Sequence, residues 1–191
     1  KNIRGLSVTM PLKEAVIPHL DGLTETAIKL NAVNCIFWDG DDLIGDNTDG
    51  AGFVNALKLQ LKEPLNKKAI AIIGAGGAAR SIINSLGDNP VKEIVVVNRS
   101  NPKAEKAAYL GGPNARVGSY ADLADCDIVV NSTPLGMAGT SEEAMLPVPV
   151  EFLSAKQTVI DLVYNPIETE LLRQAKGLGA KTFSGLGMLI H

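Results

Sequence analysis

The sequence is poor in cysteine and histidine, and it has no long apolar run and no long basic run. Its two cysteines, Cys35 and Cys126, lie far apart and form no CxxC motif. We therefore expect reduced core cysteines of a cytoplasmic protein. The two histidines, His19 and His191, lack the partner spacing of a metal site, so we expect no metal. No apolar run is long enough to span a bilayer, and we expect neither a membrane anchor nor a signal peptide.

The overall charge is also small. The chain has 191 residues, 46% hydrophobic and 20% charged, and a formal net charge of −3. These values are typical of a globular protein of one large or two small domains, and they argue against nucleic acid or an anionic membrane as a partner. The chain starts at Lys1 without Met and stops at His191 inside an apolar, helix-like run. We expect an internal piece of a longer protein.

The most informative segment is a glycine-rich turn. It lies between an apolar, strand-like run over 69–73 and a helix-like run over 77–87, and it reads Gly74-Ala75-Gly76-Gly77-Ala78. Gly74 permits a tight turn, and Gly76 lets backbone N–H groups approach a pyrophosphate. The positive end of the helix dipole then faces the phosphates. This context predicts a dinucleotide-binding site.

The strand-like run 93–98 indicates which dinucleotide binds. An NAD site usually has Asp or Glu near the end of this strand, about 20 residues beyond the glycines, to bind the ribose 2′-hydroxyl. These positions here hold Asn98, Arg99, Ser100 and, slightly later, Lys103. A guanidinium, an ammonium and a hydroxyl suit a 2′-phosphate, so we predict NADP. The alternative is that Arg99 and Lys103 are solvated charges at a helix start, where they would oppose the helix dipole.

The remaining pattern predicts an α/β protein with a Rossmann-type parallel sheet. Strand-like and helix-like runs alternate after the glycine turn, with strands at 127–131, 157–163 and 180–183 and helices at 102–110, 119–124 and 167–177. Such alternation predicts parallel strands covered on both faces. Gly74, Asn98, Asn131 and Tyr164 fall at strand ends, so they should share the edge where ligands bind.

The first part of the chain predicts part of a smaller α/β unit. We expect strands at 5–10, 32–38 and 43–45, a turn at 39–42, and helices from Pro11, over 22–30 and over 49–61. A polar connector at 63–68 marks the expected boundary. Residues 1–62 would form part of a substrate-binding and catalytic domain. Residues 63–191 would form the NADP-binding domain, with its C-terminal helices missing.

Two residues of the smaller unit are candidates for chemistry. Lys13 would lie one turn into a helix, a poor choice for the dipole, and Asp49 follows Asn47-Thr48. Taken singly, an ordinary structural role suits each of them at least as well as a catalytic one, and for Asp49 that role is an N-cap.

Short motifs follow one another along the chain: Ser-Val-Thr-Met-Pro-x-Lys, Ala-Val-Asn, Gly-Asp-Asn-Thr-Asp-Gly, Gly-Ala-Gly-Gly-Ala, Asn-Arg-Ser, Asn-Ser-Thr-Pro-x-Gly-Met, Val-Tyr-Asn-Pro and Gly-Leu-Gly-Met-Leu. In this order they closely resemble the shikimate dehydrogenase family over almost the whole length. The lysine motif together with Gly-Asp-Asn-Thr-Asp-Gly is highly specific. The resemblance implies NADPH-dependent, reversible reduction of 3-dehydroshikimate to shikimate, a step toward chorismate and the aromatic amino acids.

The resemblance also assigns residues to the reaction. The catalytic lysine of the family falls on Lys13 and its partner aspartate on Asp49, and substrate contacts fall on Thr9, Asn34 and Tyr164. Reducing a ketone needs a hydride at carbon and a proton at oxygen; a nicotinamide supplies the first and an ammonium the second. Without the family, Asn34 would be a turn residue and Tyr164 a half-buried aromatic.

On the cofactor side the resemblance adds positions beyond the glycine turn. Thr133 and Leu162 would line the path to the nicotinamide, and Gly185 and Met188 would pack near it. Gly185 also suits a plain turn. Glu25 matches a position sometimes assigned to cofactor contact, and it equally suits a helix-surface carboxylate.

Other interpretations stay open. A quinate/shikimate dehydrogenase that tolerates NAD would favour an acidic residue near Ser100, and none is present. A non-catalytic dehydrogenase-like sensor would have lost Lys13 and Asp49, which are both present. An unrelated NADP-binding module would use residues 1–60 for interaction. The partner is expected to be a small-molecule substrate, and the protein a monomer or homodimer.

The family pattern extends beyond both ends of this chain. The strands that carry a serine pair for the shikimate carboxylate would precede Lys1, and a glutamine would follow His191. We therefore expect this piece to hold NADP better than shikimate.

Overall fold

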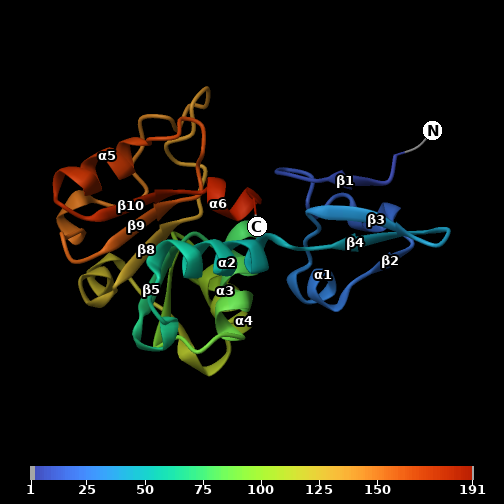
Figure 1. Cartoon of the computed structure of the whole chain (residues 1–191), viewed down its shortest axis with the longest axis horizontal. Helices are drawn as coiled ribbons and strands as arrows, with labels where there is room; N and C mark the ends of the chain where they lie inside the picture. The colour runs from blue at the N-terminus through green and yellow to red at the C-terminus, as the bar shows by residue number, and fades with distance from the viewer. Residues whose placement is uncertain (1–2, 191) are drawn as a thin grey trace.

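The computed structural model describes residues 3–190, which form two separate sheets flanked by helices (Figure 1). The larger sheet contains the strands β5 (Ala69–Ile73), β6 (Glu93–Val97), β7 (Ala115–Val117), β8 (Ile128–Asn131), β9 (Thr158–Asp161) and β10 (Lys181–Ser184). All its pairings are parallel, in the order β10-β9-β8-β5-β6-β7. The predicted parallel sheet is confirmed.

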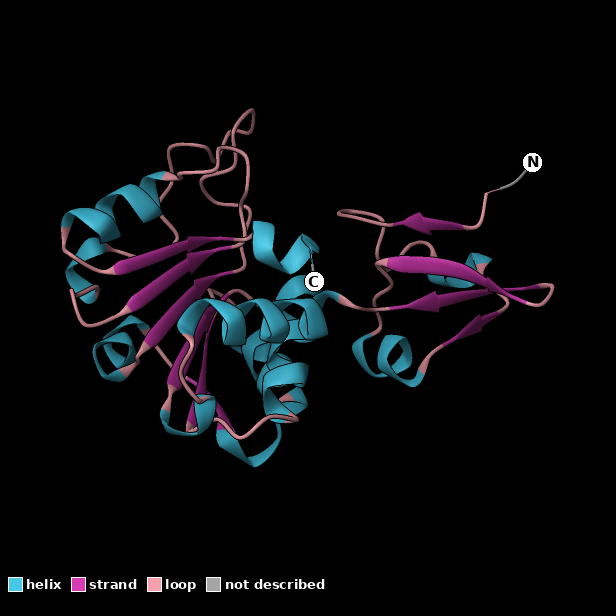
Figure 2. Ribbon diagram, viewed as in Figure 1, coloured by secondary structure: helices cyan, strands magenta, loops and turns pink. Residues whose placement is uncertain are grey.

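Both faces of the larger sheet are buried, as Figure 2 shows by the helices on either side of its strands. On one face, Ile70 and Ile72 pack with α2 (Asp49–Leu61), α3 (Gly77–Gly87) and α4 (Asn101–Leu110). On the other face, Ala71 and Ile73 pack with α5 (Glu170–Gly177). Because alternate side chains of one strand enter different cores, the central strands β5 and β6 are almost entirely apolar, which is the sequence signal that predicted them.

The strand order fixes where a ligand can bind. From β5 the chain moves outward through β6 to β7, then crosses back to β8 on the other side of β5. Ligands of open α/β sheets bind outside the carboxyl ends of the strands at such a reversal. The turn that follows β5 is the glycine-rich turn, so it lies at the reversal.

The smaller sheet precedes α2. Its strands are β1 (Gly5–Ser7), β2 (Gly22–Leu23), β3 (Cys35–Asp39) and β4 (Asp42–Asp46), in the order β1-β3-β4-β2. Only β2 and β4 pair in parallel. Its helix is α1 (Glu25–Leu30), and its buried core consists of Ala27, Val33 and Ile36. From β4 the chain enters α2, which packs on α3 and on α6 (Leu186–Ile190).

The prediction for residues 5–16 was wrong in part. The strand ends at Ser7, and residues 10–16 form turns instead of a helix, followed by a 3-10 helix over Ile17–His19. The backbone there is committed to tertiary hydrogen bonds: the Lys13 carbonyl accepts from Val33 N at 2.8 Å. Lys13 is therefore held on a loop against the smaller sheet.

Other boundaries also differ from the prediction. The run 22–30 contains β2 before α1, because the Thr24 side chain caps the helix by accepting from Ala27 N at 3.2 Å. The segment predicted as a helix over 119–124 is a 3-10 helix, and β7, of three residues, was missed. That 3-10 helix spans Tyr120–Asp125, and further 3-10 turns lie at Leu65–Lys67, Gly112–Asn114 and Val150–Phe152.

Of the two cysteines, one is buried in the core as expected and the other is not. Both are free. Cys126 is buried as expected, and burial raises the pKa of its thiol to about 11. Cys35 is only partly buried, so its assignment to the core was wrong: its neighbour Ile36 is the residue of β3 that faces the core.

Among residues 3–190, no helix is both long enough and apolar enough to cross a membrane.

Candidate active site

A cleft of about 510 Å³ opens at the carboxyl edge of the larger sheet. It is bounded by the glycine-rich turn, by the residues that follow β6, β8 and β9, and by the Lys13 loop of the smaller sheet. Many predicted site residues therefore line one space: Thr9, Lys13, Gly74, Ala75, Gly76, Gly77, Ala78, Asn98, Arg99, Thr133, Leu162 and Met188.

The glycines of the turn differ in why they are glycine. Gly74 has φ +117°, a conformation that other residues rarely adopt, and a Cβ there would lie 2.7 Å from Ser132 Oγ. Gly76 has φ −79°, and a Cβ there would meet nothing within 4 Å. Since neither backbone nor packing requires a glycine at position 76, its open space fits a ligand that lies against the backbone. The turn therefore suits a dinucleotide pyrophosphate.

The end of β6 presents positive charge to the same cleft. Arg99 is exposed and lines it, and neither Arg99 nor Lys103 forms an ion pair within the part of the chain that the structure describes. Asn98 Nδ2 donates to the Ser100 carbonyl at 3.0 Å, which fixes the bend into α4. The Arg99 guanidinium is thus available to an anion in the cleft. Ser100 and Lys103 lie just beyond its lining residues.

Lys13 and Asp49 meet at the side of the cleft formed by the smaller sheet. Lys13 Nζ donates to Asp49 Oδ2 at 2.5 Å, and the two side chains are 17% and 8% exposed. Asn34 Nδ2 donates to the other carboxylate oxygen, Asp49 Oδ1, at 2.8 Å. Both oxygens of Asp49 are thus engaged, while Lys13 also lines the cleft. This arrangement can hold an ammonium ready to give a proton to an oxygen in the cleft.

The structure does not support a plain N-cap role for Asp49 or a plain turn role for Asn34. The N-cap of α2 is Thr48, and the Asp49 side chain points to Lys13. Asn34 does follow a turn, but it bridges: its Oδ1 accepts from Thr48 N at 2.9 Å while its Nδ2 holds Asp49.

Asn34, Asp49, Ser100 and Lys103 are not among the residues that line the cleft, and three further predicted residues also lie outside its lining. Tyr164 is 48% exposed beyond β9, and Glu25 is exposed on the first turn of α1. Gly185 is buried where β10 turns into α6, and a Cβ there would lie 2.7 Å from the Leu162 backbone. Close packing alone therefore accounts for a glycine at position 185.

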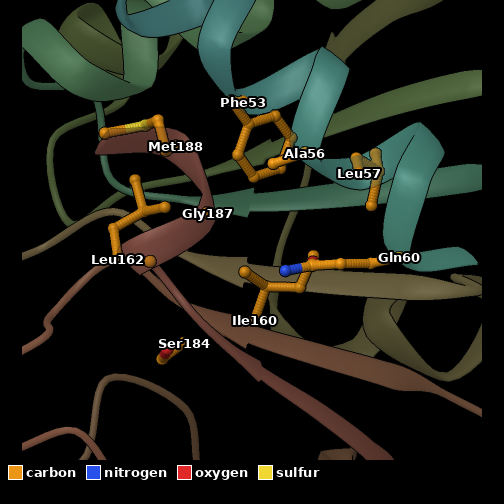
Figure 3. A pocket seen from close by; sticks show the side chains of 10 residues that line it. Phe53, Ala56, Leu57, Gln60, Ile160, Leu162, Ser184, Gly187 and Met188 are labelled. Carbon is orange, nitrogen blue, oxygen red and sulfur yellow. The ribbon is translucent and has the colours of Figure 1, made fainter. Parts of the chain in front are cut away.

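A second, apolar pocket lies between α2 and α6 (Figure 3). Phe53 from α2, Met188 from α6 and Leu162 from beyond β9 all line this pocket. Met188 and Leu162 also line the cleft, so this packing supports the cleft wall from behind.

Sequence reasoning missed a buried polar network beneath the cleft. Asp161 Oδ1 accepts from Asn131 Nδ2 at 2.8 Å and from Val163 N at 3.0 Å, and Asp161 Oδ2 accepts from Thr169 Oγ1 at 2.6 Å. Asn131 Oδ1 in turn accepts from Thr133 N at 2.9 Å. Burial raises the pKa of Asp161, and these three hydrogen bonds act in the opposite direction. The available signal was a lone aspartate inside the apolar run 157–163.

The described residues contain no group of three or more His, Cys, Asp or Glu side chains arranged to hold a metal ion.

A parallel sheet of Rossmann order, a glycine-rich turn at its reversal and a cleft-lining lysine paired with an aspartate define a dinucleotide-dependent oxidoreductase. The family model described as "Shikimate dehydrogenase substrate binding domain" matches residues 1–36, and the one described as "Shikimate / quinate 5-dehydrogenase" matches residues 56–170. The chain belongs to the shikimate/quinate dehydrogenase family.

Individual relatives agree with this assignment. The shikimate dehydrogenase (NADP(+)) of Bacillus licheniformis is 41% identical over an alignment of 194 positions, which covers 98% of this chain and 68% of the relative. A shikimate 5-dehydrogenase of Thermus thermophilus, solved with NADP(H) and shikimate, has a TM-score of 0.85 at 34% identity, covering 99% of this chain and 69% of that one. A quinate dehydrogenase of Corynebacterium glutamicum, solved with NAD, has a TM-score of 0.84 at 32% identity, covering 100% and 70%.

Proposed function

We propose that the protein is an NADP-dependent shikimate dehydrogenase that interconverts 3-dehydroshikimate and shikimate on the route to chorismate and the aromatic amino acids. The observation that carries the proposal is the contact of Lys13 with Asp49 beside a cleft that the glycine-rich turn also lines. Family membership and the names of the relatives support the same substrate and cofactor.

In this proposal Lys13 is the proton donor. NADP, when bound in its reduced form, supplies a hydride. The Lys13 ammonium gives a proton to the ketone oxygen and stabilises the negative charge that develops there. Asp49 holds that ammonium and accepts a hydrogen bond from a substrate hydroxyl. Asn34 keeps the carboxylate oriented through its hydrogen bond of 2.8 Å.

The remaining site residues are assigned by position and by family resemblance. We propose Thr9, Asn34 and Tyr164 as substrate contacts, since shikimate carries hydroxyls that such groups distinguish. We propose that the cofactor is held by Gly74–Ala78, Asn98, Arg99, Ser100, Lys103, Thr133, Leu162, Gly185, Met188 and, least directly, Glu25.

The organisation of the protein follows the same assignment. Residues 1–62 would serve the substrate and residues 63–191 the cofactor, which the separation into two sheets supports. We propose a cytoplasmic monomer or homodimer whose partners are small molecules and not nucleic acid or membrane.

Broader cofactor use is the second candidate function, favoured by the likeness to the NAD-bound quinate dehydrogenase. The absence of an acidic residue at positions 98–100 opposes it.

The test is the initial rate of dinucleotide reduction by the full-length protein, with shikimate or quinate and with NADP or NAD. We expect fast turnover only with shikimate and NADP. Comparable rates with quinate or NAD would favour the second candidate. A folded, NADP-binding protein without turnover would contradict both and leave a sensor.

A lysine substitution tests the proposed proton donor. Lys13→Ala should lower kcat by about 10²–10⁴-fold, because a positioned acid contributes about that much, while NADP affinity stays unchanged. Lys29→Ala, at an exposed position of α1, is the control. Full activity of Lys13→Ala would refute the assigned role.

A further inference from the structure

One face of α3 lies against the residues that hold the lysine–aspartate pair. Positions 77, 80 and 81 share this face, because residues three and four apart are neighbours on a helix. A Cβ on Gly77 would lie 3.7 Å from Lys13 Cδ, and Arg80 Nη2 donates to Glu14 Oε1 at 2.5 Å. The helix that begins at the glycine-rich turn therefore also contacts the Lys13 loop.

Ser81 makes the most connected of these contacts. It is 1% exposed. Its Oγ accepts from Gly50 N at 2.8 Å and donates to Asn47 Oδ1 at 2.7 Å. Asn47 Oδ1 also accepts from Asp49 N at 3.3 Å, and Asn47 Nδ2 donates to the Ala32 carbonyl at 3.0 Å. The serine hydroxyl thus holds the backbone N–H of Gly50 directly and that of Asp49 through the Asn47 side chain.

The backbones of α2 and α3 approach closely at this point. A Cβ on Gly50 would lie 2.2 Å from the Ser81 carbonyl oxygen and 2.2 Å from Ser85 Oγ. Only a glycine at position 50 allows its N–H to reach Ser81 in this geometry. This contact fixes the position of the first turn of α2, which carries Asp49, relative to α3.

We propose that Ser81 is a positioning residue for Asp49. It acts through Asn47 and through the N–H of Gly50, and it does not line the cleft. This proposal rests on the proposed function of the lysine–aspartate pair. It means that the helix whose N-terminus faces the cofactor also sets the orientation of the proton-donating pair, so a displaced carboxylate should slow chemistry more than it weakens binding.

The test compares two serines on α3. Ser81→Ala removes the hydroxyl from the network. Ser85→Ala removes a hydroxyl one turn later whose Oγ makes no hydrogen bond to another described residue, so it serves as the matched control. We expect Ser81→Ala to lower kcat by about 10-fold or more, since small misplacements of reacting groups cost up to about 10²-fold. The KM for NADP should change less than about twofold, and Ser85→Ala should match the wild type.

A double-mutant cycle with Asn47→Ala separates positioning from a general loss of structure. Because part of the effect of Ser81 passes through Asn47, the loss of kcat in the double variant should be clearly smaller than the product of the two single losses. Independent losses that multiply would overturn the proposal, as would an unchanged kcat in Ser81→Ala. If Ser81→Ala does not fold, Ser81→Cys, which keeps a weaker donor, is measured in its place by the same two criteria. A wild-type protein without turnover would instead refute the proposed function. In that case the double-mutant cycle is measured by the free energy of unfolding of the four variants, in which Ser81 and Asn47 must still be coupled.

Discussion

At the scale of single residues, Arg99 is the side chain to which we assign the choice between NADP and NAD. It lines the cleft and has no ion-pair partner within residues 3–190. Charge-assisted hydrogen bonds contribute about 1.5–3 kcal/mol, so Arg99→Ala should weaken NADP binding by about 10-fold or more. NAD binding should hardly change, and Lys106→Ala on α4 is the control. Calorimetric titration measures both affinities; an equal loss for the two cofactors would contradict the 2′-phosphate assignment.

Asp161 gives the folded state a dependence on pH. Burial raises its pKa, so between the ordinary carboxyl value near pH 4 and the raised value the folded chain binds more protons than the unfolded chain. The contribution of Asp161 to stability is therefore greatest at low pH and falls as pH rises through that interval. In Asp161→Asn we expect this fall to disappear, as measured by urea unfolding from pH 4 upward. Asp88→Asn, at an exposed position, should keep the wild-type slope, and an unchanged slope in Asp161→Asn would contradict the argument.

At the scale of elements, two glycines separate packing from ligand binding. Gly50→Ala forces α2 away from the α3 backbone, and such overpacking should cost about 1–3 kcal/mol of unfolding free energy. Gly76→Ala has open space and an ordinary φ of −79°, so its stability should stay near that of the wild type while NADP binding weakens. Urea unfolding and NADP titration distinguish them. Gly76→Ala that binds NADP normally would remove the evidence for close cofactor approach.

Whether an element could be predicted from the sequence depends on whether its conformation is set by its own residues or by distant ones. The strands β5 and β6 are buried on both faces, so their apolar runs were unambiguous. Residues 8–16 were not predictable from periodicity, because their conformation depends on hydrogen bonds to residues far along the chain, such as Val8 N to the Asn34 carbonyl at 2.8 Å.

The candidate site also contains residues that local sequence predicts and residues whose roles depend on long-range contacts. The glycine turn and Arg99 were predictable because each adjoins a recognisable strand. The pairing of Lys13 with Asp49 spans 36 positions and came only from the family resemblance. The role of Ser81 had no sequence signal, because the close approach of α2 to α3 that gives it partners arises from tertiary packing.

At the scale of the whole molecule, the two sheets differ greatly in the core that supports them. The larger sheet is packed between two extensive apolar clusters, one on each face. The smaller sheet packs on a small cluster of buried side chains, Ala27, Val33 and Ile36, to which several partly exposed apolar side chains are added. The proposed proton donor comes from the less supported part, and the α3 contacts are what tie it to the more stable part.

This difference should appear in amide hydrogen exchange. The central strand β3 of the smaller sheet and the central strand β5 of the larger sheet are both paired on two sides, so edge effects do not separate them. Local opening should cost less free energy where fewer apolar contacts are lost. We expect the β3 amides to exchange faster than those of β5, as measured by mass spectrometry at fixed pH, and Ser81→Ala to widen the gap. Equal protection of β3 and β5 would mean that the two sheets open as one cooperative unit, with the α3 contacts supplying the stability that the smaller core lacks.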